Sequence, residues 1–139
     1  MSPAQAACGL TVLIVDDEPV NRLVLARMVE LLGSRWIEAA SGHEALEVLR
    51  DQAVDVVLMD IQMPRMNGIE TVEQLRALPG PNREAPVVAL TGDTTRHRRE
   101  YLQLGFDHYA NKPISLAAVQ SMLAAKRQIS TKPCLRAVG

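Results

Sequence analysis

The chain has few cysteines and no long apolar run. Cys8 and Cys134 are its only cysteines, and they lack the spacing of a metal site or a redox pair. A disulfide framework is therefore excluded, and free thiols in a reducing cytosol are expected. No stretch reaches the roughly 18 apolar residues of a membrane-spanning helix. No basic region precedes the apolar segment 6–15, so we interpret it as the approach to a buried strand rather than a signal peptide.

Positive charge is also scarce in the body of the chain. All 16 acidic residues precede position 126, whereas the last segment is basic and holds no acid. Such an acidic body argues against broad contact with nucleic acid phosphates. With 139 residues, 47% of them hydrophobic, the chain can bury one continuous core. We therefore expect an N-terminal extension over 1–9, a single domain over 10–126 and a solvated basic tail over 127–139.

Short apolar runs alternate with segments of helical spacing along the chain. The expected strands are 11–15, 36–39, 55–59, 87–90 and 107–110. The expected helices are 19–32, 42–51, 69–78, 94–104 and 115–126. Because crossovers between parallel strands are right-handed, this alternation predicts an α/β fold with a doubly wound five-stranded parallel sheet and helices on both faces.

Apolar spacing also predicts which faces of the helices are apolar. The predicted faces consist of Val20, Val24, Met28 and Leu31 in the first helix, and of Leu116, Val119 and Leu123, facing the core, in the last. Ser41, with Glu44 three residues on, has the pattern of a capping box and predicts where the second helix begins.

Three carboxylates stand at the ends of two of these strands. Asp16 and Asp17 follow the first strand, and Asp60 follows the third. Parallel strands present their carboxyl ends to one crevice, so we expect the three acids to converge. At about 4 Å, each like-charged pair would repel by roughly 4 kcal/mol at an effective dielectric near 20, so the cluster needs a cation. Alone, Asp16 and Asp17 are equally consistent with a helix N-terminus; together with Asp60 they favour a magnesium site.

Asp60 is the candidate nucleophile of a phosphoryl site. A carboxylate beside a cation can attack phosphorus and form an acyl phosphate. Thr91 ends the fourth strand with a hydroxyl, and Lys112 follows the fifth with a point charge suited to phosphate. Taken singly, Asp60 is also consistent with a cap, Thr91 with a turn residue and Lys112 with a solvated lysine. Their joint placement at strand ends favours the site.

The residues at these strand ends resemble those of the response regulator receiver domain over about 10–126. The matching motifs are Asp16-Asp17, Asp60 to Gly68 with Met63-Pro64 and Asn67-Gly68, Leu90-Thr91-Gly92 and Lys112-Pro113. The resemblance implies the flavodoxin-like receiver fold with strand order 2-1-3-4-5.

The same resemblance implies a function. Asp60 would accept a phosphoryl group from phosphohistidine of a histidine kinase or histidine phosphotransfer protein. Magnesium, or alternatively manganese, would be held by Asp16, Asp17, Asp60 and the backbone carbonyl of Gln62. Thr91 and Lys112 would contact the phosphate. The domain would catalyse only its own phosphorylation and dephosphorylation, in the cytoplasm.

Further positions are assigned by the resemblance alone. Tyr109 would turn inward as Thr91 moves, as part of a two-state switch, although an ordinary half-buried tyrosine is the alternative. Gln62 and Asp93 would tune dephosphorylation. The basic run Arg96, His97, Arg98 and Arg99 would lie on the output face formed by the fourth helix, fifth strand and fifth helix, as a partner surface or simply a solvated one.

Three alternatives to a free-standing receiver are open. A phosphatase of the haloacid dehalogenase class normally has a second Asp where this chain has Gln62. A flavin carrier would want a Ser/Thr-rich loop in place of Asp16-Asp17-Glu18. The third alternative is a receiver fragment of a hybrid histidine kinase, which Pro19-Val20-Asn21-Arg22 resembles, whereas Met1 close to the first strand favours an independent chain. The segment after the last helix is too short for a DNA-binding domain, so output by protein contact or onward phosphotransfer is expected.

Overall fold

A five-stranded parallel sheet forms the centre of the computed structural model, which describes residues 9–92 and 96–127. The strands are β1 (Thr11–Val15), β2 (Arg35–Ala39), β3 (Val56–Asp60), β4 (Val87–Thr91) and β5 (His108–Asn111). Their order is β2-β1-β3-β4-β5, as the resemblance to the receiver domain implies, and every neighbouring pair is parallel. The carboxyl ends of all five strands therefore lie along one edge of the sheet.

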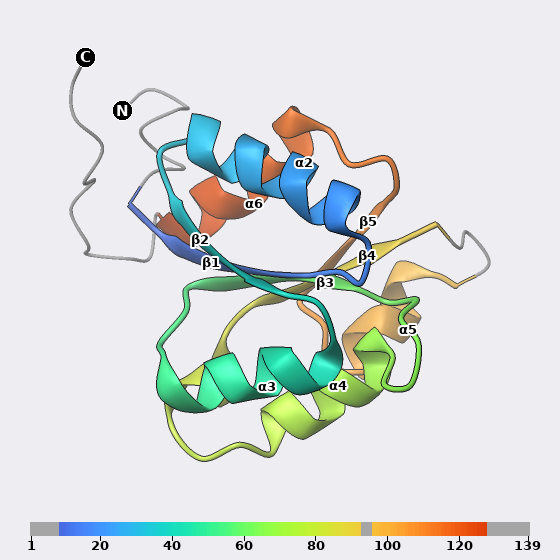
Figure 1. The fold of residues 1–139 in the computed structure, drawn as a ribbon. Helices are drawn as coiled ribbons and strands as arrows, with labels where there is room; N and C mark the ends of the chain where they lie inside the picture. Colours follow the sequence, from blue (N-terminus) through green and yellow to red (C-terminus); the bar gives the residue numbers. More distant parts are fainter. Residues whose placement is uncertain (1–8, 93–95, 128–139) are drawn as a thin grey trace.

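Helices cover both faces of this sheet (Figure 1). They are α2 (Pro19–Leu31), α3 (Gly42–Asp51), α4 (Gly68–Arg76), α5 (Arg98–Gln103) and α6 (Leu116–Arg127), with a 3-10 turn η1 (Pro81–Glu84). α2 and α6 lie on one face, and α3, α4 and α5 on the other (Figure 1). None of the helices in the described ranges is long and apolar enough to cross a membrane.

The hydrophobic core has two layers because side chains alternate across a strand. Leu13 and Val15 point into the layer under α3 and α4, whereas Val12 and Ile14 point into the layer under α2 and α6. All five residues of β3 and of β4 are buried. Such continuous apolar strands are typical of a parallel sheet covered on both faces.

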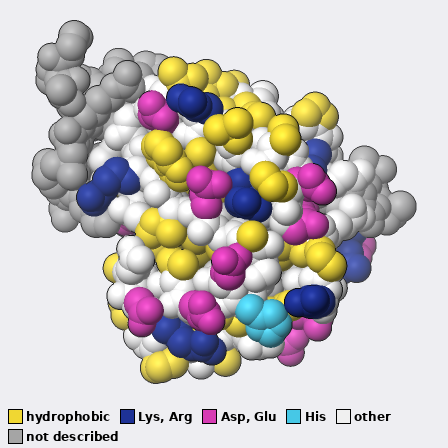
Figure 2. All heavy atoms as spheres, in the orientation of Figure 1, with side chains coloured by type: hydrophobic (Ala, Val, Ile, Leu, Met, Phe, Trp, Pro, Cys, Tyr) yellow, Lys and Arg dark blue, Asp and Glu magenta, His cyan; other side chains and the backbone are white. Residues whose placement is uncertain are grey.

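Of the predicted apolar face of α2, only Met28 packs partly against the core. Val20, Val24 and Leu31 are 67%, 47% and 61% exposed, and hydrophobic side chains gather on the surface over α2 (Figure 2). Leu25 and Val29 face the sheet instead. Because apolar residues occur all around this helix, their spacing permits more than one stripe, and packing against the sheet selects one.

Two smaller predictions are also corrected. Leu116 is 40% exposed, although Val119 and Leu123 are fully buried as predicted; Leu116 is the first residue of α6 and lies at the helix end. α5 begins at Arg98, not near 94, because His97 has an extended backbone and precedes the helix. Ser41 caps α3 as predicted, since its side chain accepts a hydrogen bond from the Glu44 amide.

Arg76 links loops at the amino ends of β4 and β5, opposite the predicted site. Its guanidinium donates to the carbonyls of Gly105 (2.7 Å) and Ala85 (2.7 Å) and pairs with Asp107 (2.8 Å). Asp107 in turn accepts a hydrogen bond from the Val87 amide. A single arginine thus fixes where two strands begin.

Candidate functional site

The three predicted acids converge at the carboxyl edge of the sheet. β1 and β3 are neighbours in register, with Val15 opposite Met59, so the next residues, Asp16 and Asp60, come side by side. One carboxylate oxygen from each of Asp16, Asp17 and Asp60 lies within 4.8 Å of the others. Asp16 and Asp60 are buried, and Asp17 is partly exposed. The site is therefore set by strand register and by the turn after β1.

The surroundings of Asp16 fix its side chain. Its amide donates to the Ala39 carbonyl (3.1 Å), its carbonyl accepts from Arg22 Nη1 (2.6 Å) and its Oδ1 accepts from the Glu18 amide (2.9 Å). Among the described residues, its buried Oδ2 has no hydrogen-bond partner. The nearest cation to that oxygen is Lys112, whose Nζ lies at 3.6 Å. Asp16 thus presents one oxygen toward the site.

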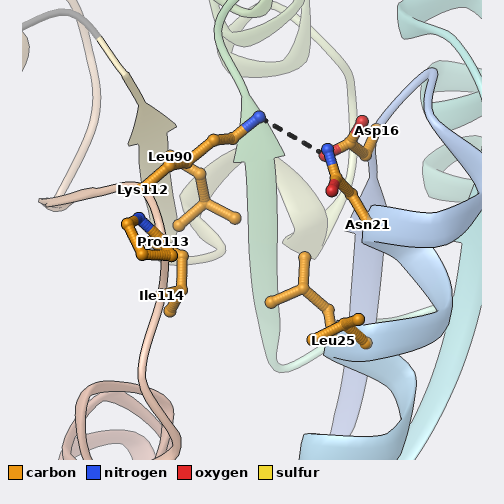
Figure 3. Close-up of a pocket in the computed structure, with 8 residues that line it drawn as sticks. Asp16, Asn21, Leu25, Leu90, Lys112, Pro113 and Ile114 are labelled. Atoms are coloured by element: carbon orange, nitrogen blue, oxygen red, sulfur yellow. Dashed lines mark ion pairs between the residues drawn. The ribbon is translucent and has the colours of Figure 1, made fainter.

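Lys112 reaches from the end of β5 to the carboxylate of Asp16 (Figure 3). Its Nζ donates to Asp60 Oδ1 at 3.0 Å, and the Gln62 amide donates to the same oxygen at 3.2 Å. The Lys112 amide donates to the Thr91 carbonyl (2.8 Å), which holds the lysine at the end of the sheet. The peptide bond between Lys112 and Pro113 is cis.

Both members of this ion pair have shifted pKa values. Burial raises the pKa of Asp60 above its ordinary value, and the charge of Asp16 acts in the same direction, against the effects of Lys112 and the Gln62 amide. Burial by itself would lower the pKa of Lys112, but the hydrogen bond that its ammonium donates to Asp60 and the charges of both acids outweigh burial and raise that pKa. Lys112 therefore keeps its proton, whereas burial makes the charged form of Asp60 less favourable than it is in water.

The residues present fit a hard divalent cation. Three carboxylates converge, and Lys112 supplies one positive charge to two of them. Asp16 Oδ2 is buried without a hydrogen bond among the described residues. Carboxylate oxygens of this kind are the ligands that magnesium takes in phosphate-binding sites. Asp16, Asp17 and Asp60 would hold such an ion.

The other predicted residues surround this cluster. Thr91 is the buried last residue of β4. Gln62 is exposed, and its backbone amide donates a hydrogen bond to Asp60 Oδ1. Tyr109 is half-buried and stacks on Tyr101, with ring centroids 5.4 Å apart and planes inclined by 18°.

The remaining predicted positions are less informative. Arg96 lies 5.8 Å over the Tyr101 ring, and Arg98 and Arg99 are exposed. Asp93 lies outside the described residues, as do Cys8 and Cys134.

A cavity of about 430 Å³ opens beside the acids. Asp16 and Lys112 lie at one end of it, and Leu25 and Ile114 at the other (Figure 3). Sequence reasoning missed this hollow and also missed the part that Arg22 plays next to Asp16. A basic residue in the first turn of the helix after an acidic pair was the available signal for Arg22.

This geometry gathers three acids and a lysine at the strand ends of a doubly wound sheet. The sequence profile of the response regulator receiver domain matches residues 12–124. The chain therefore belongs to the receiver domain family, its fold is the flavodoxin-like receiver fold, and it is a signalling domain of the two-component type. The predicted family and fold are confirmed, and the phosphatase alternative is not favoured.

Two relatives are sensor proteins. The chain is 38% identical over 118 residues to the sensor protein GacS of Pseudomonas syringae pv. syringae, covering 83% of this chain and 13% of GacS. It is 35% identical over 115 residues to the aerobic respiration control sensor protein ArcB of Escherichia coli K12, covering 83% and 15%. The chain thus spans less than a sixth of the length of either relative.

One solved structure is similar over nearly its whole length. It is the receiver domain of a sensor histidine kinase from Pseudomonas aeruginosa PAO1, with a TM-score of 0.78 and 33% identity. The match covers 86% of this chain and 98% of that one. That structure has a magnesium ion coordinated in its active site cleft.

Proposed function

We propose that Asp60 accepts a phosphoryl group from a phosphohistidine, carried by a histidine kinase or a histidine phosphotransfer protein. The observation that carries this proposal is the placement of Asp60 at the end of β3, with Asp16 and Asp17 within 4.8 Å and the Lys112 ammonium at 3.0 Å. Magnesium, or alternatively manganese, is held by Asp16, Asp17, Asp60 and the backbone carbonyl of Gln62. The magnesium ion of the Pseudomonas aeruginosa receiver domain supports this part of the proposal.

The transfer is a nucleophilic displacement at phosphorus. A carboxylate oxygen of Asp60 attacks in line, the new O–P bond forms and the N–P bond of phosphohistidine breaks. The electron pair of that bond stays on the ring nitrogen, which leaves as neutral imidazole when the other ring nitrogen carries a proton. When bound, the metal ion stabilises the charge on the transferring oxygens. Lys112 adds a positive charge, and the Thr91 hydroxyl donates a hydrogen bond to the new phosphate.

Signalling after phosphorylation follows from Thr91 and Tyr109. We propose that Thr91 shifts toward the phosphate and that Tyr109 changes its packing with it. The stack of Tyr109 on Tyr101 supports this, because it connects β5 to α5. The surface of α5, β5 and α6, with Arg96 at its edge, then meets a partner protein, unless the phosphoryl group is passed on. Gln62 and Asp93 tune how fast water removes the phosphoryl group.

The wider setting is part of the same proposal. The receiver comprises residues 10–126, flanked by an extension over 1–9 and a basic tail over 127–139, and it works in the cytoplasm with a phosphorelay. The sensor relatives support the phosphorelay, because the matched region is a part of much longer sensor proteins. The receiver catalyses only its own phosphorylation and dephosphorylation.

The test uses the parent and the Asp60→Asn variant. Each is incubated with magnesium and a small acyl phosphate, and intact mass is read with an EDTA control. One phosphoryl group on the parent alone, absent with EDTA, is expected. A parallel reaction with a phosphohistidine donor tests whether the protein takes the phosphoryl group only from a kinase or phosphotransfer protein. A folded parent that gains no mass from either donor would overturn the proposal.

A further inference from the structure

We infer that Arg22 is a positioning residue for the metal site, because its guanidinium holds the peptide that joins Asp16 to Asp17 against Glu38 of β2. This inference rests on the proposed function, since it concerns how the same three acids are aimed. Arg22 does not touch the acceptor Asp60 in any hydrogen bond or ion pair of the described structure.

Arg22 connects three elements at the site. Its backbone amide donates to the Glu18 carbonyl (3.1 Å), so the first turn of α2 fixes where its side chain starts. The side chain is only 16% exposed. Its Nη1 donates to the Asp16 carbonyl at 2.6 Å, and its Nε pairs with Glu38 Oε1 at 3.2 Å. Arg22 thereby links α2, the end of β1 and β2.

The hydrogen bond to the Asp16 carbonyl affects two candidate ligands. The carbonyl of Asp16 and the amide of Asp17 belong to one planar peptide unit, so fixing the carbonyl fixes how that plane is turned. The Asp16 amide and Oδ1 are already bound by Ala39 and Glu18. With the carbonyl held as well, Asp16 Oδ2 is left to face the site. Losing Arg22 frees the peptide plane and both carboxylates with it.

An arginine suits this position for two reasons. Its planar guanidinium offers donors in a rigid fork, so one side chain serves the carbonyl and the carboxylate together. The carboxylate of Glu38 also offsets the positive charge of Arg22, so the guanidinium competes less with a metal ion for Asp16 and Asp17. Groups that orient metal ligands in this way typically change metal affinity by about 10-fold or more when removed.

The test asks whether Arg22 orients the carboxylates of Asp16 and Asp17 or only stabilises the packing of α2 on the sheet. Arg22→Met removes the donors and keeps an apolar stem. Arg76→Met is the matched control, because Arg76 also binds backbone carbonyls and a carboxylate, but at the opposite end of the sheet. Magnesium affinity is measured by titration calorimetry on folded protein, and thermal unfolding is followed with EDTA present.

We expect Arg22→Met to bind magnesium on the order of 10-fold more weakly than the parent. Arg76→Met loses thermal stability and keeps the parent affinity. Arg22→Lys, which keeps one donor without the fork, falls between the parent and Arg22→Met. Parent affinity in Arg22→Met, or an equal loss in Arg76→Met, would overturn the inference.

A second variant covers the case in which Arg22→Met does not fold. Glu38→Gln leaves Arg22 in place but removes the carboxylate that anchors and offsets it, so a smaller loss of magnesium affinity is expected. Unchanged affinity in Glu38→Gln, with Arg22→Met unfolded, would also overturn the inference. A parent that binds no magnesium and takes no phosphoryl group contradicts the proposed function itself, whatever the Arg22 variants do.

Discussion

The ammonium of Lys112 donates a hydrogen bond of 3.0 Å to Asp60 Oδ1, across the ends of β5 and β3. β4 lies between these two strands, so the pair depends on the order of the sheet. The same ammonium lies 3.6 Å from Asp16. Lys112 therefore provides the positive charge that the described structure places on both buried acids.

Replacing Lys112 should destabilise the metal-free protein at neutral pH. Lys112→Met leaves Asp16 and Asp60 buried without their cation, and a lost hydrogen bond to a charged group costs about 1.5–3 kcal/mol. The free energy of unfolding, measured with urea in EDTA, is expected to fall by that amount. Magnesium should recover much of the loss, because a metal ion supplies the missing charge. An unchanged free energy of unfolding in EDTA would contradict this role.

The stability of the metal-free protein should depend on pH through Asp60. Burial raises the pKa of Asp60 above its ordinary 3.8, so the native state holds the proton more tightly than the unfolded chain does. The stability from Asp60 is therefore fully present below the ordinary pKa and is lost as pH rises through the raised native pKa. Lys112 stays protonated across this window, since its own pKa is raised from 10.5.

The measurement compares the parent with Asp60→Asn in EDTA. The variant cannot ionise at this position, so the parent should lose stability relative to the variant as pH rises from about 4 toward neutrality. Urea unfolding at a series of pH values gives the difference. A difference that stays constant, or that moves in the parent's favour as pH rises, would show that burial does not raise the pKa of Asp60.

Gly68 should tolerate no side chain. A Cβ there would lie 2.5 Å from the Asp60 carbonyl oxygen and 2.9 Å from Ile61 Cα. Both neighbours are backbone atoms next to the acceptor, so Gly68→Ala must displace the start of α4 or the end of β3. We expect a loss of about 1–3 kcal/mol in the free energy of unfolding, together with slower phosphoryl uptake.

Gly92→Ala is the matched control for that substitution. Among residues 9–92 and 96–127, no heavy atom lies within 4 Å of a Cβ built at Gly92, although this residue directly follows Thr91. Its free energy of unfolding should stay within about 0.5 kcal/mol of the parent. Equal free energies of unfolding in the two alanine variants would show that the start of α4 can move away from Gly68 without loss of stability.

Asp17 should contribute to magnesium binding more than to the fold. It is partly exposed, and its carboxylate lies with those of Asp16 and Asp60. Asp17→Ala removes one of the three carboxylates, so magnesium affinity measured by titration calorimetry should fall. Unfolding in EDTA should change little, because like charges are removed from the cluster. Parent-like magnesium affinity in Asp17→Ala would exclude Asp17 as a ligand.

The sheet and the site were predictable for a shared physical reason. Buried parallel strands are short continuous apolar runs, and the polar residues just after each run mark the sheet edge, so the pattern predicts that Asp16, Asp60 and Lys112 lie together. The face of α2 was not predictable, because apolar residues surround that helix and only the packed sheet decides between them. The start of α5 depends on the extended backbone of His97, which the basic run does not signal.

The sequence signals that a basic residue, Arg22, follows the acidic pair, but it does not show which atoms Arg22 binds. A hydrogen bond from a side chain to a backbone carbonyl six residues earlier requires no particular residue at the accepting position. Only the geometry of the turn after β1 shows that the Asp16 carbonyl faces Arg22. The same holds for Arg76, whose carbonyl and carboxylate partners lie in two connections, Arg83 and Ala85 before β4 and Gly105 and Asp107 before β5.

The most direct test of the account is to locate the phosphoryl group. The parent is phosphorylated with magnesium and an acyl phosphate, then reduced with borohydride, which converts an aspartyl phosphate into homoserine, and its peptides are sequenced by mass spectrometry. Homoserine is expected at position 60 and nowhere else, and its formation is expected to require both the donor and magnesium. Homoserine at Asp16 or Asp17, or a phosphorylated parent with Asp60 intact, would contradict this expectation.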